Sequence, residues 1–235
     1  MAKALAFRGG TALHKLLLPR PGRYSEDIDL VQVAPGPIGP VLDAVREALD
    51  PWLGEPGRKQ TAEGATLVYR FESSGLPVQP MRLKVEINTR EHGSHRAMRG
   101  QDFVVSSPWF EGAATIAIYS AEELLGTKLR ALYQRKKGRD LFDLGRALSE
   151  LQVDDAGIVA MLGEYLRRDD LRITRAQFER NLAQKEQMPE FLGDVLPLLP
   201  AGMAYDPIAT LNMVRARLVE RLPGRPWRKP DRNES

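Results

Sequence analysis

Apolar and polar residues alternate in parts of the first half of the chain, which is the pattern of a β-strand with one buried face. The clearest case is residues 82–88, where aliphatic residues alternate with charged and polar ones. Residues 66–72 have a similar character, and a short strand is expected at residues 28–33. Side chains two residues apart on a strand share a face, so Lys84 and Glu86 are predicted to project together.

Helical spacing of apolar residues begins at residues 41–49 and then takes over after Ser120, almost to the C-terminus. A further short helix is expected at residues 12–18. The pattern therefore predicts an α/β (α+β) fold with a small sheet in residues 1–118. A helical domain follows over residues 119–222, and a basic, proline-rich tail at 223–235 is expected to be extended or flexible.

Composition narrows the chemistry that the chain can support. The 235 residues include no cysteine and three histidines. A disulfide framework, a thiolate zinc site and a cysteine nucleophile are therefore excluded, and any metal chemistry falls to carboxylates. The absence of cysteine fits a reducing cytoplasm. Since the apolar runs are too short to span a bilayer, no membrane partner is expected. A net charge of +3 favours a polyanionic partner only weakly.

Two aspartates, Asp27 and Asp29, lie in the predicted strand near residue 28. Their spacing predicts that both carboxylates project from the same face while Ile28 and Leu30 enter the core. Two neighbouring carboxylates repel each other unless a cation lies between them, and oxygen ligands suit Mg²⁺ or Mn²⁺. An Asp-x-Asp pair on its own is more often a feature of a solvated strand or turn.

The turn Gly9-Gly10-Thr11 precedes the aspartate pair and leads into the predicted helix. Glycines allow a phosphate to approach the backbone closely, and the N–H groups at the start of a helix favour an anion. The turn is therefore a candidate site for the triphosphate of a nucleotide. The alternative is a simple helix cap, but the combination with the aspartate pair is more specific than either feature alone.

A lysine, Lys128, lies within an apolar stripe formed by Leu124, Leu125, Leu129 and Leu132. A lysine in such a stripe needs an anionic partner, and either a triphosphate or a nearby aspartate can supply one. Basic residues surround this block and are expected to bind a nucleic-acid backbone, the alternative being a solvated charged face. They are Arg130, Arg135, Lys136, Lys137 and Arg139.

Several blocks of the sequence, taken together and in order, resemble the polymerase-beta-type nucleotidyltransferase superfamily, and more narrowly the AbiEii-like toxins of type IV toxin–antitoxin systems. The blocks are GGTAL at residues 9–13, YSEDIDL at 24–30, KVEI at 84–87, KLRAL at 128–132 and RDLFDL at 139–144. The interval between the first two blocks is longer than in the compact form of the superfamily, and residues 19–22 look like the extra turn.

The resemblance implies a nucleotidyltransferase core with a small mixed sheet, followed by a helical domain that completes the active site. It also implies roles for individual residues. The catalytic residues would be Asp27, Asp29, Lys128 and Asp140, with Lys128 contacting phosphate and Asp140 orienting it or the acceptor. The nucleotide would be held by Gly9, Gly10, Thr11, Ser25 and Lys128, and the metal by Asp27, Asp29 and Glu86. For Glu86, an exposed pair with Lys84 is an equally open alternative; for Lys128 and Asp140, the alternative is a structural salt bridge between helices.

The function implied is a metal-dependent toxin that transfers a nucleotide from a nucleoside triphosphate to an acceptor, blocking translation. The expected acceptor is the 3′ end of tRNA, and an antitoxin encoded nearby is the expected protein partner. Two alternatives stay open. One is a nucleotidyltransferase that acts on a small molecule or a protein side chain, and the other is a catalytically idle, nucleotide-binding regulatory module.

Overall fold

The structure is a computed structural model that describes residues 4–20, 22–25 and 27–228. The chain divides into two compact units, each described here by itself. The first comprises the chain up to Arg20 and Ser25–Ser120, and the second comprises residues 22–24 and the chain from Ala121 on. The predicted boundary after residue 118 lies close to this division. The sequence did not indicate that residues 22–24 belong with the helical unit.

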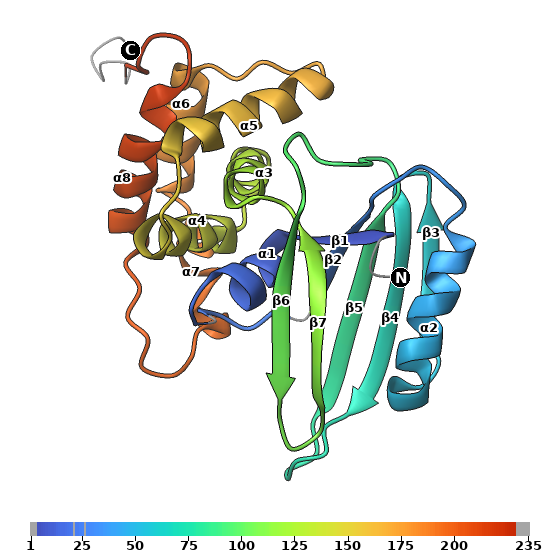
Figure 1. Cartoon of the computed structure of the whole chain (residues 1–235). Helices are drawn as coiled ribbons and strands as arrows, with labels where there is room; N and C mark the ends of the chain where they lie inside the picture. The colour runs from blue at the N-terminus through green and yellow to red at the C-terminus, as the bar shows by residue number, and fades with distance from the viewer. Residues whose placement is uncertain (1–3, 21, 26, 229–235) are drawn as a thin grey trace. The chain divides into compact units, whose positions relative to one another are not determined.

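A seven-stranded mixed sheet forms the first unit, with the strand order β3-β4-β5-β2-β1-β7-β6 (Figure 1). Strand β2 pairs in parallel with β5, and β1 pairs in parallel with β7, while the other neighbours are antiparallel. The predicted mixed sheet is thus confirmed. The strands are β1 (Leu5–Arg8), β2 (Asp27–Gln32), β3 (Gly57–Thr61), β4 (Gly64–Glu72), β5 (Pro80–Asn88), β6 (Arg99–Ser106) and β7 (Glu111–Ile118).

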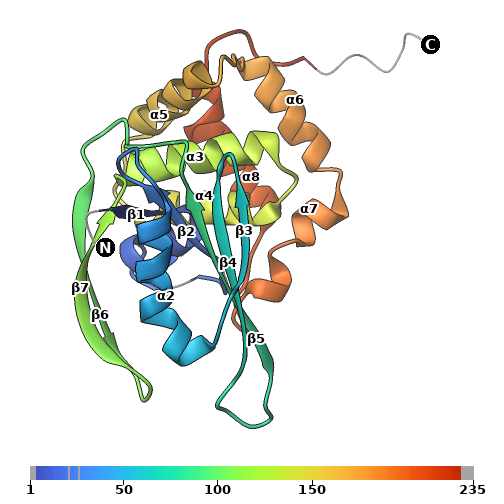
Figure 2. The same ribbon diagram turned by 90° about the vertical axis from the view of Figure 1, so that its right-hand side faces the viewer.

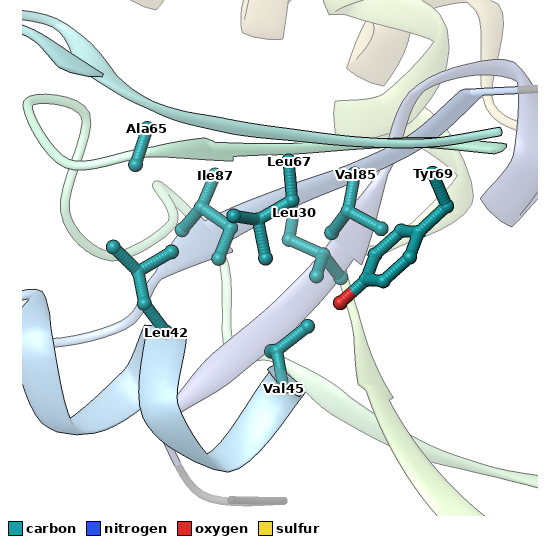
Figure 3. Close-up of a cluster of buried hydrophobic side chains, with 8 residues drawn as sticks. All are labelled: Leu30, Leu42, Val45, Ala65, Leu67, Tyr69, Val85 and Ile87. Atoms are coloured by element: carbon teal, nitrogen blue, oxygen red, sulfur yellow. The ribbon is translucent and has the colours of Figure 1, made fainter. Parts of the chain in front are cut away.

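Helix α2 (Gly39–Leu53) covers one face of the sheet around β2, β4 and β5 (Figures 1 and 2). The side chains between them form a buried apolar cluster, shown in Figure 3. Its members are Leu30, Leu42, Val45, Ala65, Leu67, Tyr69, Val85 and Ile87. Because alternate residues of a strand face opposite sides, the polar residues between them on β2 and β5 project from the other face.

The helix expected at residues 12–18 begins earlier and changes its winding. Helix α1 (Gly9–Ala12) continues directly into a π-helix, η1 (Leu13–Leu17), which buries Leu13 and Leu16. The helix therefore starts at the first glycine of the turn that follows β1, immediately after the strand ends.

Helices make up the second unit, in agreement with the pattern after Ser120. They are α3 (Ala121–Gln134), α4 (Gly138–Glu150), α5 (Asp155–Arg168), α6 (Arg175–Lys185), α7 (Pro189–Gly193), η2 (Leu196–Leu198), α8 (Pro207–Arg217) and η3 (Val219–Arg221). The leucine stripe of α3 is buried as predicted. No helix in the described part of the chain is both long and apolar enough to cross a lipid bilayer.

The tail at residues 223–235 was expected to be flexible, but its first part packs against α6. The backbone N–H of Arg175 donates to the carbonyl oxygen of Pro223, 2.8 Å away, and the N–H of Trp227 donates to Glu179 Oε2 at 2.6 Å. Trp227 lines a cavity of about 830 Å³ beside α6. Proline-rich composition alone did not reveal these contacts, and residues 229–235 lie outside the described part.

Candidate active site

The two aspartates lie at the start of β2 and project from the face of the sheet opposite α2. In the parallel register with β5, Asp27 is opposite Lys84 and Asp29 is opposite Glu86. The apolar residues Ile28 and Leu30 between and after them pack on the other face, in the cluster under α2. Asp27 and Asp29 therefore share a face, as the alternation predicted, and the pairing of β2 with β5 places Glu86 on that same face.

The glycine turn brings the backbone of α1 directly against Asp29. Gly9 has a φ of +72°, and a Cβ placed on it would lie 2.0 Å from Asp29 Oδ2. Any side chain at position 9 would thus collide with the carboxylate, in a backbone conformation that only glycine adopts at little cost. The turn and the aspartate pair, recognised separately in the sequence, form one site in the first unit.

Thr11 and Ser25 fix the start of β2 to the start of the helix. The Thr11 hydroxyl donates to the carbonyl oxygen of Asp27, and its Oγ1 lies 3.0 Å from Ser25 Oγ. Because a hydroxyl carries a single proton, Ser25 is the donor in the second contact. Both hydroxyls therefore position the aspartate strand, and their predicted contact with phosphate stays a prediction.

Asp27 offers a structural test of whether this site suits a cation. Its Oδ1 is buried and makes no hydrogen bond within residues 4–20, 22–25 and 27–228. A buried polar atom without a partner is costly, and a carboxylate oxygen in this state is a suitable ligand for a hard cation such as Mg²⁺. The donor set, two carboxylates beside a glycine turn, leaves the remaining ligands of the ion to phosphate and water.

Glu86, the predicted third carboxylate, is bound by its strand neighbour. Its Oε1 lies 2.8 Å from Lys84 Nζ, and its side chain is 40% exposed. Within the described residues, no three metal-ligating side chains are gathered so that they could hold an ion. The pair with Lys84 is therefore the observed arrangement, and a role for Glu86 in metal binding stays a prediction.

Lys128 and Asp140 lie in the second unit, where aspartates supply the anionic partner that the lysine needs. Lys128 Nζ is 2.7 Å from Asp143 Oδ2 and 3.2 Å from Asp140 Oδ1. Arg23 makes a two-pronged contact with the same Asp143, with Nε to Oδ1 at 2.7 Å and Nη2 to Oδ2 at 2.8 Å. Arg135 Nη2 lies 3.0 Å from Asp140 Oδ1.

These ion pairs keep the buried cations charged. Burial on its own lowers the pKa of Lys128, but the neighbouring carboxylates of Asp143 and Asp140 outweigh it, so the pKa lies above its usual value. The same holds for Arg23. Burial lowers its pKa, but the hydrogen bonds and the charge of Asp143 outweigh this effect, so the pKa lies above its usual value. We refer to Arg23, Lys128, Asp140 and Asp143 as the buried charge cluster.

Asp143 and Arg23 were not assigned roles from the sequence. Asp143 could have been found from the sequence, because it lies three residues after Asp140 and therefore shares a helix face with it. Arg23 could not, since it lies beside the segment that looked like an extra surface turn. The structure shows instead that Arg23 is buried and that Gly22 packs closely against Phe142: a Cβ placed on Gly22 would lie 3.2 Å from Cε1 of that ring.

Three of the five basic residues predicted around α3 and α4 are paired with acidic ones. Arg130 Nη1 lies 2.8 Å from Asp169 Oδ2, and Lys137 Nζ lies 3.7 Å from Asp194 Oδ1. Arg135 binds Asp140 as described above. Ion pairs therefore hold Arg130, Arg135 and Lys137, and the predicted binding of a nucleic-acid backbone by this block stays a prediction.

Comparison with known proteins identifies the family of the chain and its fold. The family model described as nucleotidyl transferase AbiEii toxin, type IV toxin–antitoxin system, matches residues 1–214. No curated protein matches the sequence significantly. Among solved structures, MenT4, a nucleotidyltransferase toxin from Mycobacterium tuberculosis, is similar with a TM-score of 0.67 and 23% identity, covering 94% of this chain and 77% of MenT4.

A second solved structure, JHP933 from Helicobacter pylori, is similar with a TM-score of 0.53 and 19% identity, covering 92% of this chain and 82% of JHP933. At these identities the two structures establish the fold, and the family match over most of the sequence establishes the relationship. The chain belongs to the AbiEii nucleotidyltransferase toxin family of type IV toxin–antitoxin systems.

Proposed function

We propose that this nucleotidyltransferase toxin is metal-dependent and transfers a nucleotide from a nucleoside triphosphate to the 3′ end of tRNA, which would block translation. One observation supports the chemistry above all: Asp27 and Asp29 share a sheet face, and the carboxylate of Asp29 lies against the glycine turn at Gly9. Carboxylates and a phosphate-accepting turn in contact are what nucleotidyl transfer requires.

In the proposed reaction, Asp27 and Asp29 hold a divalent ion, Mg²⁺ or Mn²⁺, which when bound supplies positive charge to the phosphate oxygens. The backbone of Gly9 and Gly10 lets the triphosphate approach, and Thr11 and Ser25 fix this backbone. The acceptor hydroxyl forms a bond to the α-phosphorus, the bond to pyrophosphate breaks, and the hydroxyl proton leaves to a carboxylate or to solvent. Positioning and charge carry most of the catalysis.

The RNA acceptor rests on the family relationship and on the excess of basic residues, with a net charge of +3. The predicted contact of Lys128 with phosphate would need a change of partner, because Asp140 and Asp143 already bind its ammonium group. We therefore assign the buried charge cluster a structural role within its own unit, where it joins α3 to α4. An antitoxin encoded nearby is the expected partner, and the cytoplasm the expected place of action.

A labelling experiment tests this proposal. The purified protein is incubated with each labelled nucleoside triphosphate and total RNA, with and without Mg²⁺. We expect label in the tRNA fraction, and loss of labelling by at least about 100-fold in Asp29→Asn, which removes a proposed ligand of the ion. Asp43→Asn changes an exposed aspartate on α2 and is the matched control.

Each alternative acceptor gives a distinct result. Label that enters a small molecule or a protein, with none in RNA, would show that the acceptor is wrong while the transfer chemistry is right. Nucleotide binding without any transfer, unchanged in Asp29→Asn, would identify a regulatory module and overturn the proposed activity.

A further inference from the structure

A row of basic residues lies on the same face of the sheet as the carboxylates. The register places Lys59 on β3 opposite Thr66 on β4, Thr66 opposite Glu86, and Glu86 opposite Asp29. Residues that are directly opposite share a face, so Lys59 lies in line with Asp29 across four strands.

Two arginines extend this surface along the strands. Arg70 on β4 is directly opposite Arg82 on β5, and both are exposed. Arg82 lies two residues before Lys84, the partner of Asp27, so the arginine pair lies one repeat, about 7 Å, beyond the level of Asp27. We call Lys59, Arg70 and Arg82 the basic sheet surface.

Arg70 and Arg82 bring two like charges directly opposite each other on this face of the sheet. Glu72 on β4 follows in the next position on the same face and can offset part of this charge. A polyanion bound on this face would meet positive charge from the arginine pair to Lys59. The exposure of all three basic residues keeps them accessible to such a ligand.

Strand order decides which part of the reaction this surface would serve. Strand β2 carries the aspartates and lies between β5 and β1 in the sheet. The glycine turn, where the triphosphate is proposed to bind, follows β1, whereas the basic sheet surface is on β3, β4 and β5. The two therefore lie on opposite sides of the aspartate pair. On the β1 side, Arg8 is ion-paired with Glu91.

We propose that Lys59, Arg70 and Arg82 bind the backbone phosphates of the nucleic-acid acceptor and direct its terminal hydroxyl to the aspartates. This inference rests on the proposed function, and it assigns the acceptor to the β3–β5 side and the triphosphate to the β1 side. Contacts of this kind fix register and orientation without reading the base sequence. They also make the affinity depend on salt concentration, since bound counterions are released.

The test compares two double variants of the full-length chain. Arg70→Gln/Arg82→Gln removes the arginine pair, and Arg58→Gln/Arg99→Gln removes the same charge from exposed residues elsewhere. A single pair adds a sharper control: Lys59→Gln is matched by Arg58→Gln, because Arg58 is the neighbour on β3 whose register partner, Leu67, faces α2.

Binding of fluorescently labelled total tRNA is measured over a range of salt concentrations without nucleotide, and KM values for tRNA and for the nucleotide are measured in the transfer reaction. For Arg70→Gln/Arg82→Gln we expect binding about tenfold weaker at ~0.1 M salt and a salt slope smaller by about 2, since each lost phosphate contact removes about one unit. The KM for tRNA should rise, while kcat and the KM for nucleotide stay as in wild type.

An equal effect of both double variants would overturn the inference, since general charge would then explain the binding. A raised KM for nucleotide, with unchanged tRNA binding, would also overturn it and assign the arginines to the triphosphate. Failure of the wild type to label any RNA refutes the proposed acceptor separately, because the salt-dependent binding measurement needs no turnover. Unchanged thermal unfolding of the variants confirms that they are folded.

Discussion

Position 9 shows how one residue can be constrained by both backbone and chemistry. A residue with a Cβ at position 9 would have to adopt a positive φ and would lie 2.0 Å from Asp29 Oδ2. We therefore predict that Gly9→Ala displaces the Asp29 carboxylate and lowers transfer activity by at least about 100-fold, the range seen when a catalytic group is misplaced.

The same substitution should also destabilise the fold by about 1–3 kcal/mol, the cost of a strained backbone conformation. Urea unfolding measures this. Gly163→Ala is the control, because nothing lies within 4 Å of a Cβ there and the residue is within α5, so alanine should stabilise slightly. Full activity of Gly9→Ala would show that the turn is not part of the site.

The lowered pKa of Lys185 predicts a pH dependence of stability that is opposite in sign to that of an ion-paired lysine. Burial lowers its pKa to about 8, while its Nζ donates to the carbonyl oxygens of Leu132 and Tyr133 at the end of α3. Since the unfolded chain titrates near 10.5, the unfolded state binds more protons between pH 8 and 10.5. The free energy of unfolding should therefore rise with pH over this window, relative to its value below pH 8.

Lys185→Met lacks this titration. The unfolding free energy of the wild type minus that of the variant should therefore increase from pH 8 to 10.5. Urea unfolding at several pH values measures the difference. If the wild-type value minus the variant value stays constant or decreases over this window, the lowered pKa is contradicted.

At the scale of elements, helices α3 and α4 are joined by charges within an apolar interface. Removing one partner of a buried ion pair leaves the other charge uncompensated, at a cost of about 3–5 kcal/mol. Asp143 binds both Lys128 and Arg23, so we predict a loss of this size in Asp143→Asn, measured by chemical unfolding. Asp43→Asn should be neutral; a neutral Asp143→Asn would mean that the cluster is dispensable.

Strong periodicity made several elements predictable. Aliphatic alternation identified β5, and spacing of apolar residues identified α2, because each buries one regular face. Strand β3 could not be found this way. All of its residues are exposed, so its sequence does not alternate between buried apolar and exposed polar positions. The hairpin of β6 and β7 leaves Val104 and Trp109 exposed, so its apolar residues do not mark a buried side.

The candidate site was predictable where its residues are close in sequence. The Asp-x-Asp spacing predicted one shared face, and β2 provides it. Contacts between distant segments were not predictable: Arg23 with Asp143 joins positions 120 residues apart. The sequence also could not show that aspartates, rather than a nucleotide, bind Lys128, because both satisfy the same need for negative charge.

At the scale of the whole molecule, family membership predicts toxicity that depends on the chemistry of the first unit. Expression should arrest bacterial growth, and Asp29→Asn should remove the arrest while Asp43→Asn keeps it. Growth curves at matched protein levels, checked by immunoblot, measure this. Equal arrest by Asp29→Asn would point to toxicity through binding or sequestration rather than through transfer.

The most direct test of the central claim is Mn²⁺ binding, measured by electron paramagnetic resonance in the presence of a non-hydrolysable nucleoside triphosphate analogue. If Asp27 and Asp29 hold the ion, wild type and Asp43→Asn should bind Mn²⁺ alike, and Asp27→Asn and Asp29→Asn should each bind at least about tenfold more weakly, a loss of roughly 1.4 kcal/mol or more. Wild-type affinity in both variants would contradict the account.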